Sequence, residues 1–152
     1  MPNKPLSSQE LRIWHAFKLL GEGVMERVER DIVQATGLSG SDFGVLSRLA
    51  DLGKGEMRQH TLAESLRWNK SRLSHHLTRM QQRHLIERRD VDTRAVLVVL
   101  SMQGRAKLDA ARPVHAASIR RNLLSRLSRD QSEGLLAISE LLNGEEPVRD
   151  HI

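Results

Sequence analysis

The 152-residue sequence contains no cysteine and no tyrosine, and only two tryptophans and two phenylalanines. Without cysteine there can be no disulfide, no thiolate metal site and no thiol-based redox switch. Because aromatic residues are so scarce, the hydrophobic core has to be built from leucine, valine, isoleucine, alanine and methionine. Leucine, alanine and methionine are strong helix formers, so the composition favours helices.

Long apolar runs are absent as well. No stretch approaches the roughly 18 consecutive apolar residues that a membrane-spanning helix needs. The first ten residues, MPNKPLSSQE, lack the apolar segment of a secretory signal. We therefore expect no membrane association and a cytoplasmic location. The length suits one compact domain, or two small lobes that share a core.

Sequence motifs of enzymes and metal sites are also missing. There is no HExxH motif, nucleophile elbow, glycine-rich phosphate loop or cluster of carboxylates. His15 and His115 have no carboxylate at metal-ligand spacing, so we interpret them as structural or solvent-facing. We predict that the protein is not an enzyme and uses no metal and no cofactor.

The positive charge of the chain is concentrated in one segment. The sequence has 24 basic and 19 acidic residues, a formal net charge of +5. Residues 58–94 contain nine basic and four acidic residues, so they carry the whole surplus, and the rest of the chain is balanced. Such a local basic surface suits a polyanionic partner, although charge alone leaves an ordinary solvated face as the alternative.

Hydrophobic periodicity and capping signals predict a mainly α protein with a small β-hairpin, an α+β fold. Ser7 and Glu10 have capping-box spacing and begin a long first helix. The turn from Leu66 through Trp68 to Asn69 separates a short third helix from a fourth. Pro113 should kink the fifth helix. The expected helices cover about 8–36, 39–52, 60–66, 70–82, 101–127 and 128–142, and the expected hairpin has strands near 85–86 and 96–100 joined by an acidic turn.

The fourth predicted helix has two contrasting faces. Leu73, Leu77 and Met80 form a narrow apolar stripe at about 100° per residue. No aspartate or glutamate occurs between Lys70 and Arg83. The face opposite the stripe carries hydroxyl, amide, imidazole and guanidinium groups, which can contact base edges or phosphates. Its residues are Ser71, Arg72, Ser74, His75, Thr78, Arg79 and Gln82.

The predicted hairpin is basic near its turn. Arg88, Arg89 and Arg94 flank Asp90 and Asp92, so a wing of this kind would place arginine in a minor groove, where the potential is most negative. Asp92 is expected to orient Arg94 rather than to contact DNA, because phosphates repel a bare carboxylate. A turn salt bridge with no role in DNA binding remains the alternative for this pair.

The sequence resembles the multiple-antibiotic-resistance regulator (MarR) family of bacterial transcription factors over nearly its whole length. The matching residues include Leu62-Ala63-Glu64, Leu66, the run from Asn69 to His75, and Leu85-Ile86-Glu87-Arg88. The most specific part is the wing signature, Asp92-x-Arg94-Ala95 followed by Val98-x-Leu100-Ser101-x-x-Gly104. The resemblance implies a winged helix-turn-helix DNA-binding domain at 37–104, between dimerisation helices at 1–36 and 105–152.

The resemblance also implies a function. Members of the family are homodimers that bind pseudo-palindromic operators in double-stranded DNA, most often as repressors. By position, the resemblance assigns base contacts to Ser71, Arg72, Ser74 and His75, phosphate contacts to Lys70 and Arg79, and the wing tip to Arg94. Two departures stand out. His84 replaces the usual glycine before the first wing strand, so a different backbone is expected there, and the third helix begins without a clear capping residue.

Relatives often bind small phenolic or other lipophilic effectors between the dimerisation helices and the winged domain. Trp14, Phe17, Phe43 and Met57 are the candidate lining residues here, but their spacing is equally that of ordinary core. A second alternative also stays open for the whole protein, namely a winged-helix module that binds nucleic acid or protein without a ligand response.

Overall fold

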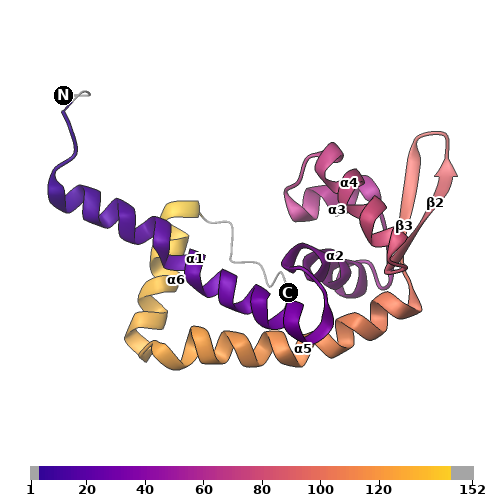
Figure 1. The fold of residues 1–152 in the computed structure, drawn as a ribbon. Coiled ribbons are helices and arrows are strands. Elements are labelled where there is room, and N and C mark those ends of the chain that lie inside the picture. The colour runs from indigo at the N-terminus through magenta and orange to yellow at the C-terminus, as the bar shows by residue number, and fades with distance from the viewer. Residues whose placement is uncertain (1–3, 145–152) are drawn as a thin grey trace.

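The computed structural model describes residues 4–144, and these form six α-helices and a three-stranded antiparallel sheet. Figure 1 shows the two long helices α1 and α5 lying along one another, with the smaller helices and the sheet forming a lobe at one end. The elements are α1 (Ser8–Thr36), α2 (Gly40–Asp51), β1 (Glu56–Arg58), α3 (Gln59–Leu66), α4 (Lys70–Gln82), β2 (Ile86–Asp92), β3 (Ala95–Leu100), α5 (Met102–Asn122), the 3-10 turn η1 (Leu124–Arg126) and α6 (Arg129–Asn143).

The predicted mixture of helices and a hairpin is confirmed, and so are most of the capping signals. Ser7 accepts a hydrogen bond from the backbone N–H of Glu10, whose carboxylate accepts one from the N–H of Ser7 at 2.7 Å. Ser128 begins α6 with the same kind of capping box. Gly37 ends α1 in the left-handed conformation at φ 75°, which glycine adopts without steric cost. Local chemistry thus fixes these helix ends.

The sheet differs from the prediction in two ways. Strand β1, which was not predicted, pairs with β3, so that Met57 lies opposite Val98 and the strand order is β1-β3-β2. The charged segment expected as a turn is strand β2, and the turn itself is only Thr93 and Arg94. Most of β2 is solvent-exposed, so it accepts charged side chains while its backbone pairs with the apolar strand β3.

Helix α5 continues through Pro113. It is shorter than expected, because it ends at Asn122 instead of near Leu127. The side-chain amide of Asn122 donates a hydrogen bond to the carbonyl of Ser118 at 3.0 Å. Its oxygen accepts a hydrogen bond from Arg27 of α1 at 3.1 Å. A buried asparagine of this kind offers the backbone an alternative to further helix, and the chain turns into η1.

The hydrophobic core lies almost wholly in the lobe that carries the sheet. Fully buried side chains from α2, α3, α4 and β3 meet there, among them Leu46, Leu62, Leu77 and Val98. From α1, Ile32 belongs to this core and Val28 packs against it. The first half of α1, residues 8–22, is exposed in the single chain.

The domain boundaries at 36 and 104 remain a prediction, and residues 1–3 and 145–152 within them lie outside the described residues. In the span 4–144, no helix is long and apolar enough to cross a bilayer.

Candidate nucleic-acid interface

Helix α4 forms with the two faces that its sequence predicts. Asn69 begins it, because its side-chain oxygen accepts the backbone N–H of Arg72 at 2.8 Å. The stripe of Leu73, Leu77 and Met80 is fully buried against the core of the lobe. This packing fixes the rotation of the helix and turns the opposite face outward.

The outward face of α4 contains donors and no carboxylate. Its first turn has no acidic residue, so the positive end of the helix dipole is not neutralised by its own side chains. Ser74 is half-buried at the edge of this face. The exposed residues are Lys70, Ser71, Arg72, His75, Thr78, Arg79 and Gln82.

Two of the three arginines of the wing, Arg88 and Arg89, lie away from its turn. Arg88 and Arg89 lie on the stem of the hairpin, opposite Val98 and Leu97 of β3, and not at its tip. Arg88 donates to the side chains of Gln81 at 2.8 Å and Thr78 at 3.0 Å, so it ties the wing to α4. Arg89 pairs with Glu87 on the surface of β2. These contacts use donors that would otherwise be available to DNA.

Arg94 occupies the turn of the wing, as the sequence suggested. Asp92 accepts the backbone N–H of Arg94 at 2.8 Å and so shapes the turn. Within residues 4–144 the guanidinium of Arg94 forms no hydrogen bond or ion pair. Asp92 thus orients the residue through its backbone and leaves its side chain available.

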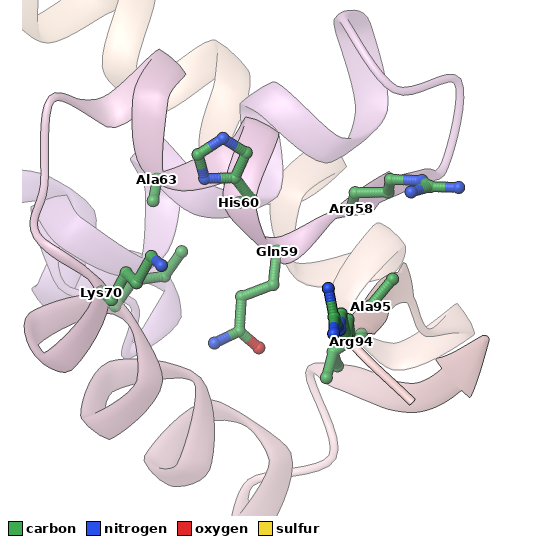
Figure 2. Close-up of a pocket in the computed structure, with 9 residues that line it drawn as sticks. Arg58, Gln59, His60, Ala63, Lys70, Arg94 and Ala95 are labelled. Carbon is green, nitrogen blue, oxygen red and sulfur yellow. The ribbon is translucent and has the colours of Figure 1, made fainter. Parts of the chain in front are cut away.

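A cavity of about 450 Å³ separates the start of α4 from the wing. Figure 2 shows the amide of Gln59, the first residue of α3, in the middle of this cavity, with Lys70 on one side and Arg94 on the other. Helix α3 begins without a side-chain cap, as expected, so its first backbone N–H groups lack that partner. The cavity therefore brings together a cation from α4, a cation from the wing and an amide that sequence reasoning did not identify.

Asp42 connects α4 to the junction between α1 and α2. This carboxylate, 1% exposed, accepts a hydrogen bond from Arg83 at 2.7 Å and lies 3.0 Å from Nε2 of His76. Arg83 also donates to the carbonyl of Gly37 at 3.0 Å. Burial alone would raise the pKa of Asp42, but the contacts with His76, Arg83 and the N–H of Ser39 outweigh it and hold that pKa well below its usual range.

The same network affects a predicted phosphate contact. Nη2 of Arg79 lies 3.2 Å from Nδ1 of His76, so Arg79 donates to the imidazole and only part of its guanidinium faces outward. The sequence placed Asp42 correctly at the start of α2, but nothing local to it indicated partners on α4. Their separation along the chain, 41 residues between Asp42 and Arg83, hides the contact from any pattern.

The four residues proposed to line an effector pocket do not gather at one place in this chain. Trp14 and Phe17 stack on each other, with ring centroids 6.0 Å apart, on the exposed half of α1. Phe43 packs against His115 in the lobe, at 4.5 Å between centroids, and burial lowers the pKa of His115. Phe17 lies fifteen helical steps, about 22 Å, from the buried Ile32 at the lobe. Met57 packs on the core from β1.

The end of the molecule far from the wing has an apolar surface with no partner among residues 4–144. A cavity of about 550 Å³ between α1, η1 and α6 is lined almost entirely by apolar groups, including Leu20, Met25, Leu127 and Ile138. Away from the lobe, the large hydrophobic side chains exposed on the two helices are Leu11, Ile13, Trp14, Phe17, Leu19, Leu20 and Met25 of α1, and Leu136, Ile138, Leu141 and Leu142 of α6. We call these two sets the apolar face.

Comparison with known proteins gives matches among solved structures, whereas no family model and no curated protein matches the chain. AbsC, a MarR-family transcriptional regulator from Streptomyces coelicolor, is 29% identical, with 94% of this chain and 100% of that chain covered at a TM-score of 0.80. A second MarR-family regulator from the same organism, in complex with DNA, is 23% identical, with 97% and 94% covered at a TM-score of 0.84.

A third match is the organohalide-sensing regulator RdhR in its 2,4-dichlorophenol-bound form. It is 21% identical, with 94% of this chain and 87% of that chain covered at a TM-score of 0.77. The similarity to all three extends over the long helices as well as the lobe that carries the wing.

Proposed function

We propose that this protein, a winged helix-turn-helix regulator of the MarR family, binds a pseudo-palindromic operator in double-stranded DNA as a homodimer and represses transcription. One observation carries the proposal. The acid-free outer face of α4 lies beside a wing whose turn presents the guanidinium of Arg94, and Lys70 and Arg94 lie on opposite sides of the amide of Gln59. A helix of these dimensions fits the major groove, and the adjacent wing would then meet the minor groove.

The donor chemistry favours a DNA duplex over RNA or protein. Hydroxyl, imidazole and guanidinium groups on a straight helix match the donor and acceptor pattern of the DNA major groove. The major groove of duplex RNA is too narrow to admit such a helix. The same surface has no exposed apolar cluster of the kind that a protein partner usually contacts.

The apolar face supports the homodimer. Because α1 and α6 expose apolar side chains along one end, a second copy related by a two-fold axis would cover both sets at once.

We also propose that a small lipophilic or phenolic molecule releases the protein from DNA. One matched structure contains 2,4-dichlorophenol, and this chain combines aromatic side chains on α1 with an aromatic contact between α2 and α5. The two copies of a dimer each have one lobe that carries a wing. A ligand that binds only the DNA-free arrangement of these two lobes would reduce the population of the DNA-bound arrangement. Phe43 and Met57 remain the proposed lining residues at the lobe, and Trp14 and Phe17, which do not reach the lobe in this chain, are proposed to line the site from the second copy.

Selection from a randomised pool of DNA duplexes tests the central claim. The enriched duplex is then used in gel-shift titrations at stepped salt concentrations, with excess unlabelled RNA and with scrambled duplex as competitors. We expect enrichment of an inverted repeat and a strong salt dependence, with weak competition by RNA. Equal competition by RNA, or no sequence preference at any salt concentration, would leave only a general nucleic-acid-binding module.

Two further assays test repression and release. A reporter gene placed behind the enriched duplex should lose expression when the protein is present, and an increase would instead indicate an activator. Adding 2,4-dichlorophenol or another small phenol to the gel shift should reduce binding in a dose-dependent way. If no phenol tested changes the affinity, the proposal of a phenolic effector is rejected while that of DNA binding stands.

A further inference from the structure

Trp68 lies in the turn between α3 and α4, and Arg72 lies one helical turn after it. The guanidinium carbon of Arg72 sits 4.0 Å from the centroid of the Trp68 ring, within the range of a cation–π contact. Within residues 4–144 the Arg72 side chain has no hydrogen bond or ion pair. A guanidinium that stacks through its face keeps its N–H donors free, because those donors lie along its edge.

We propose that Trp68 is a positioning residue, a stacking platform that holds Arg72 in the orientation in which its donors meet a base in the major groove. The inference rests on the proposed function, since it assumes that α4 enters that groove. Trp68 itself is not predicted to contact DNA. Its effect on DNA binding would pass through Arg72.

The side chain of Trp68 is itself held by the hydrophobic core and by His76. Trp68 packs against the hydrophobic core, and His76 meets its ring edge-on at 5.5 Å between centroids. His76 is buried and lies 3.0 Å from the carboxylate of Asp42. Asp42 is in turn bound by Arg83 and by the backbone N–H of Ser39. The orientation of the indole thus depends on the junction between α1 and α2.

The other arginines near α4 are held differently. Arg79 donates to His76, and Arg88 donates to Thr78 and Gln81, so both use N–H groups on protein acceptors. Arg72 is restrained by a ring face and uses none of its donors there. This difference suits Arg72 to bidentate contact with the O6 and N7 atoms of guanine.

Holding a long side chain before binding should raise affinity. A free arginine samples many rotamers, and fixing it upon binding lowers affinity by about three- to tenfold per side chain. A platform that restricts Arg72 in the unbound protein removes part of that cost. It also disfavours rotamers that would let Arg72 contact a neighbouring base or a phosphate, so base preference at one position should depend on Trp68.

Two substitutions at position 68 separate stacking from packing. Trp68→Leu keeps an apolar side chain but removes the π face, whereas Trp68→Phe keeps a smaller π face. Each variant is titrated against the duplex enriched by the wild-type protein and against single-base variants of that duplex. We expect Trp68→Leu to bind about three- to tenfold more weakly and to discriminate less at one base pair, and Trp68→Phe to recover most of both. Thermal unfolding and circular dichroism confirm that both variants are folded.

A double-mutant cycle with Arg72→Ala provides the decisive comparison. If Trp68 acts through Arg72, Trp68→Leu has no further effect on affinity or on base preference in the Arg72→Ala background. Equal losses in both backgrounds, or equal losses for Trp68→Leu and Trp68→Phe, would overturn the proposal and leave Trp68 as core packing. If the wild-type protein enriches no duplex at all, the proposed function fails instead, so the two failures are distinguishable.

Discussion

Single residues of the basic segment differ in what their charges already contact. Lys70 and Arg94 face a shared cavity beside Gln59. Other arginines of the same segment already donate hydrogen bonds to acceptors within the protein, and composition alone does not show this. These arginines are Arg79, Arg83, Arg88 and Arg89. We therefore expect the electrostatic part of DNA binding to depend more on Lys70 and Arg94 than on a count of positive charges.

Substitutions of Lys70 and Arg72 should affect DNA binding in different ways. Lys70→Ala should weaken all duplexes alike and reduce the slope of log affinity against log salt by about one unit, because one phosphate contact is lost. Arg72→Ala should weaken the enriched duplex by about 1–3 kcal/mol and relax base preference. Arg129→Ala on α6, where Arg129 is exposed and pairs with Glu133, is the control and should change neither quantity. Wild-type affinity and specificity in both α4 variants would show that this face does not contact DNA.

Asp42 should make the stability of the protein sensitive to acid. Its pKa in the folded state is lowered, so its stabilising contribution is complete above the unfolded-state value, about pH 4, and is lost progressively as the pH falls towards the folded-state value. Asp42→Asn should lower the free energy of unfolding at pH 7 by about 1–3 kcal/mol, less than for a wholly buried pair, because Arg83 is partly exposed.

Urea unfolding of wild type and Asp42→Asn at pH 7, 5 and 3 measures this contribution. The gap in stability between the two proteins should narrow as the pH falls. Asp51→Asn is a suitable control, because Asp51 pairs with Arg112 at a more exposed position. A gap that stays constant from pH 7 to pH 3 would mean that Asp42 stabilises the fold through shape and not through its charge.

Among the elements, those with local signals were predicted and those that depend on distant partners were not. Capping boxes at Ser7 and Ser128 fixed helix starts, since the partners lie three residues apart. Strand β1 escaped prediction because three residues carry no usable alternation, and it forms only because β3 offers it an edge. The surface of α4 was predictable from its helical period, whereas the stacking of Arg72 on Trp68 depends on rotamers that no pattern specifies.

The junction after α4 also depends on contacts that are distant in the sequence. The resemblance places His84 where the family usually has glycine, so a different backbone is expected there. His84 adopts the left-handed conformation at φ 60°, a region that glycine enters without steric cost. Ser101 helps to hold this strained residue, because its hydroxyl donates to the carbonyl of His84 at 2.6 Å. A contact from the start of α5 thus accompanies a conformation that histidine rarely adopts.

Gly104 should be intolerant of any side chain. A Cβ at this position would lie 2.0 Å from the carbonyl oxygen of Leu85, so α5 and the start of the wing could not remain this close. Gly104→Ala should destabilise the protein by about 1–3 kcal/mol or more. Gly44→Ala is the matched control, since a Cβ there meets side chains at ordinary contact distances within α2. That change should be neutral or stabilising by up to about 1 kcal/mol, because alanine favours helix.

Chemical denaturation of the two glycine variants decides between these expectations. If Gly104→Ala were as stable as Gly44→Ala, the close approach of α5 to the Leu85 carbonyl would not be a requirement of the fold.

At the scale of the whole molecule, the lobe with α4 and the wing lies at one end and the apolar face lies at the other, and long helices join the two ends. Helix α1 has 29 residues and is about 43 Å long, so it extends well beyond the lobe that supplies the core. Two such chains joined through their apolar ends would present two α4 helices to one side of a duplex. Half-sites one helical turn apart, about 34–36 Å, are then the spacing expected in the operator.

A charge placed on the apolar face should separate the two copies. Met25→Glu puts a carboxylate at a position that is 72% exposed in the single chain and lines the cavity between α1 and α6. Met102→Glu makes the identical change at a 91% exposed methionine at the start of α5, outside that face. Burying an unpaired charge in an interface costs about 2–5 kcal/mol, so Met25→Glu should dissociate at concentrations where Met102→Glu and the wild type sediment at twice the chain mass.

Loss of the dimer should also change how DNA is bound. A monomer occupies each half-site independently, so Met25→Glu should lose the tight binding that comes from linking two α4 helices in one dimer. Its affinity for an isolated half-site should stay close to that of the wild type. Comparing the two variants on full and half duplexes therefore separates dimerisation from base contact. Sedimentation of Met25→Glu as a stable dimer would place the interface elsewhere, and the apolar face would then need another occupant.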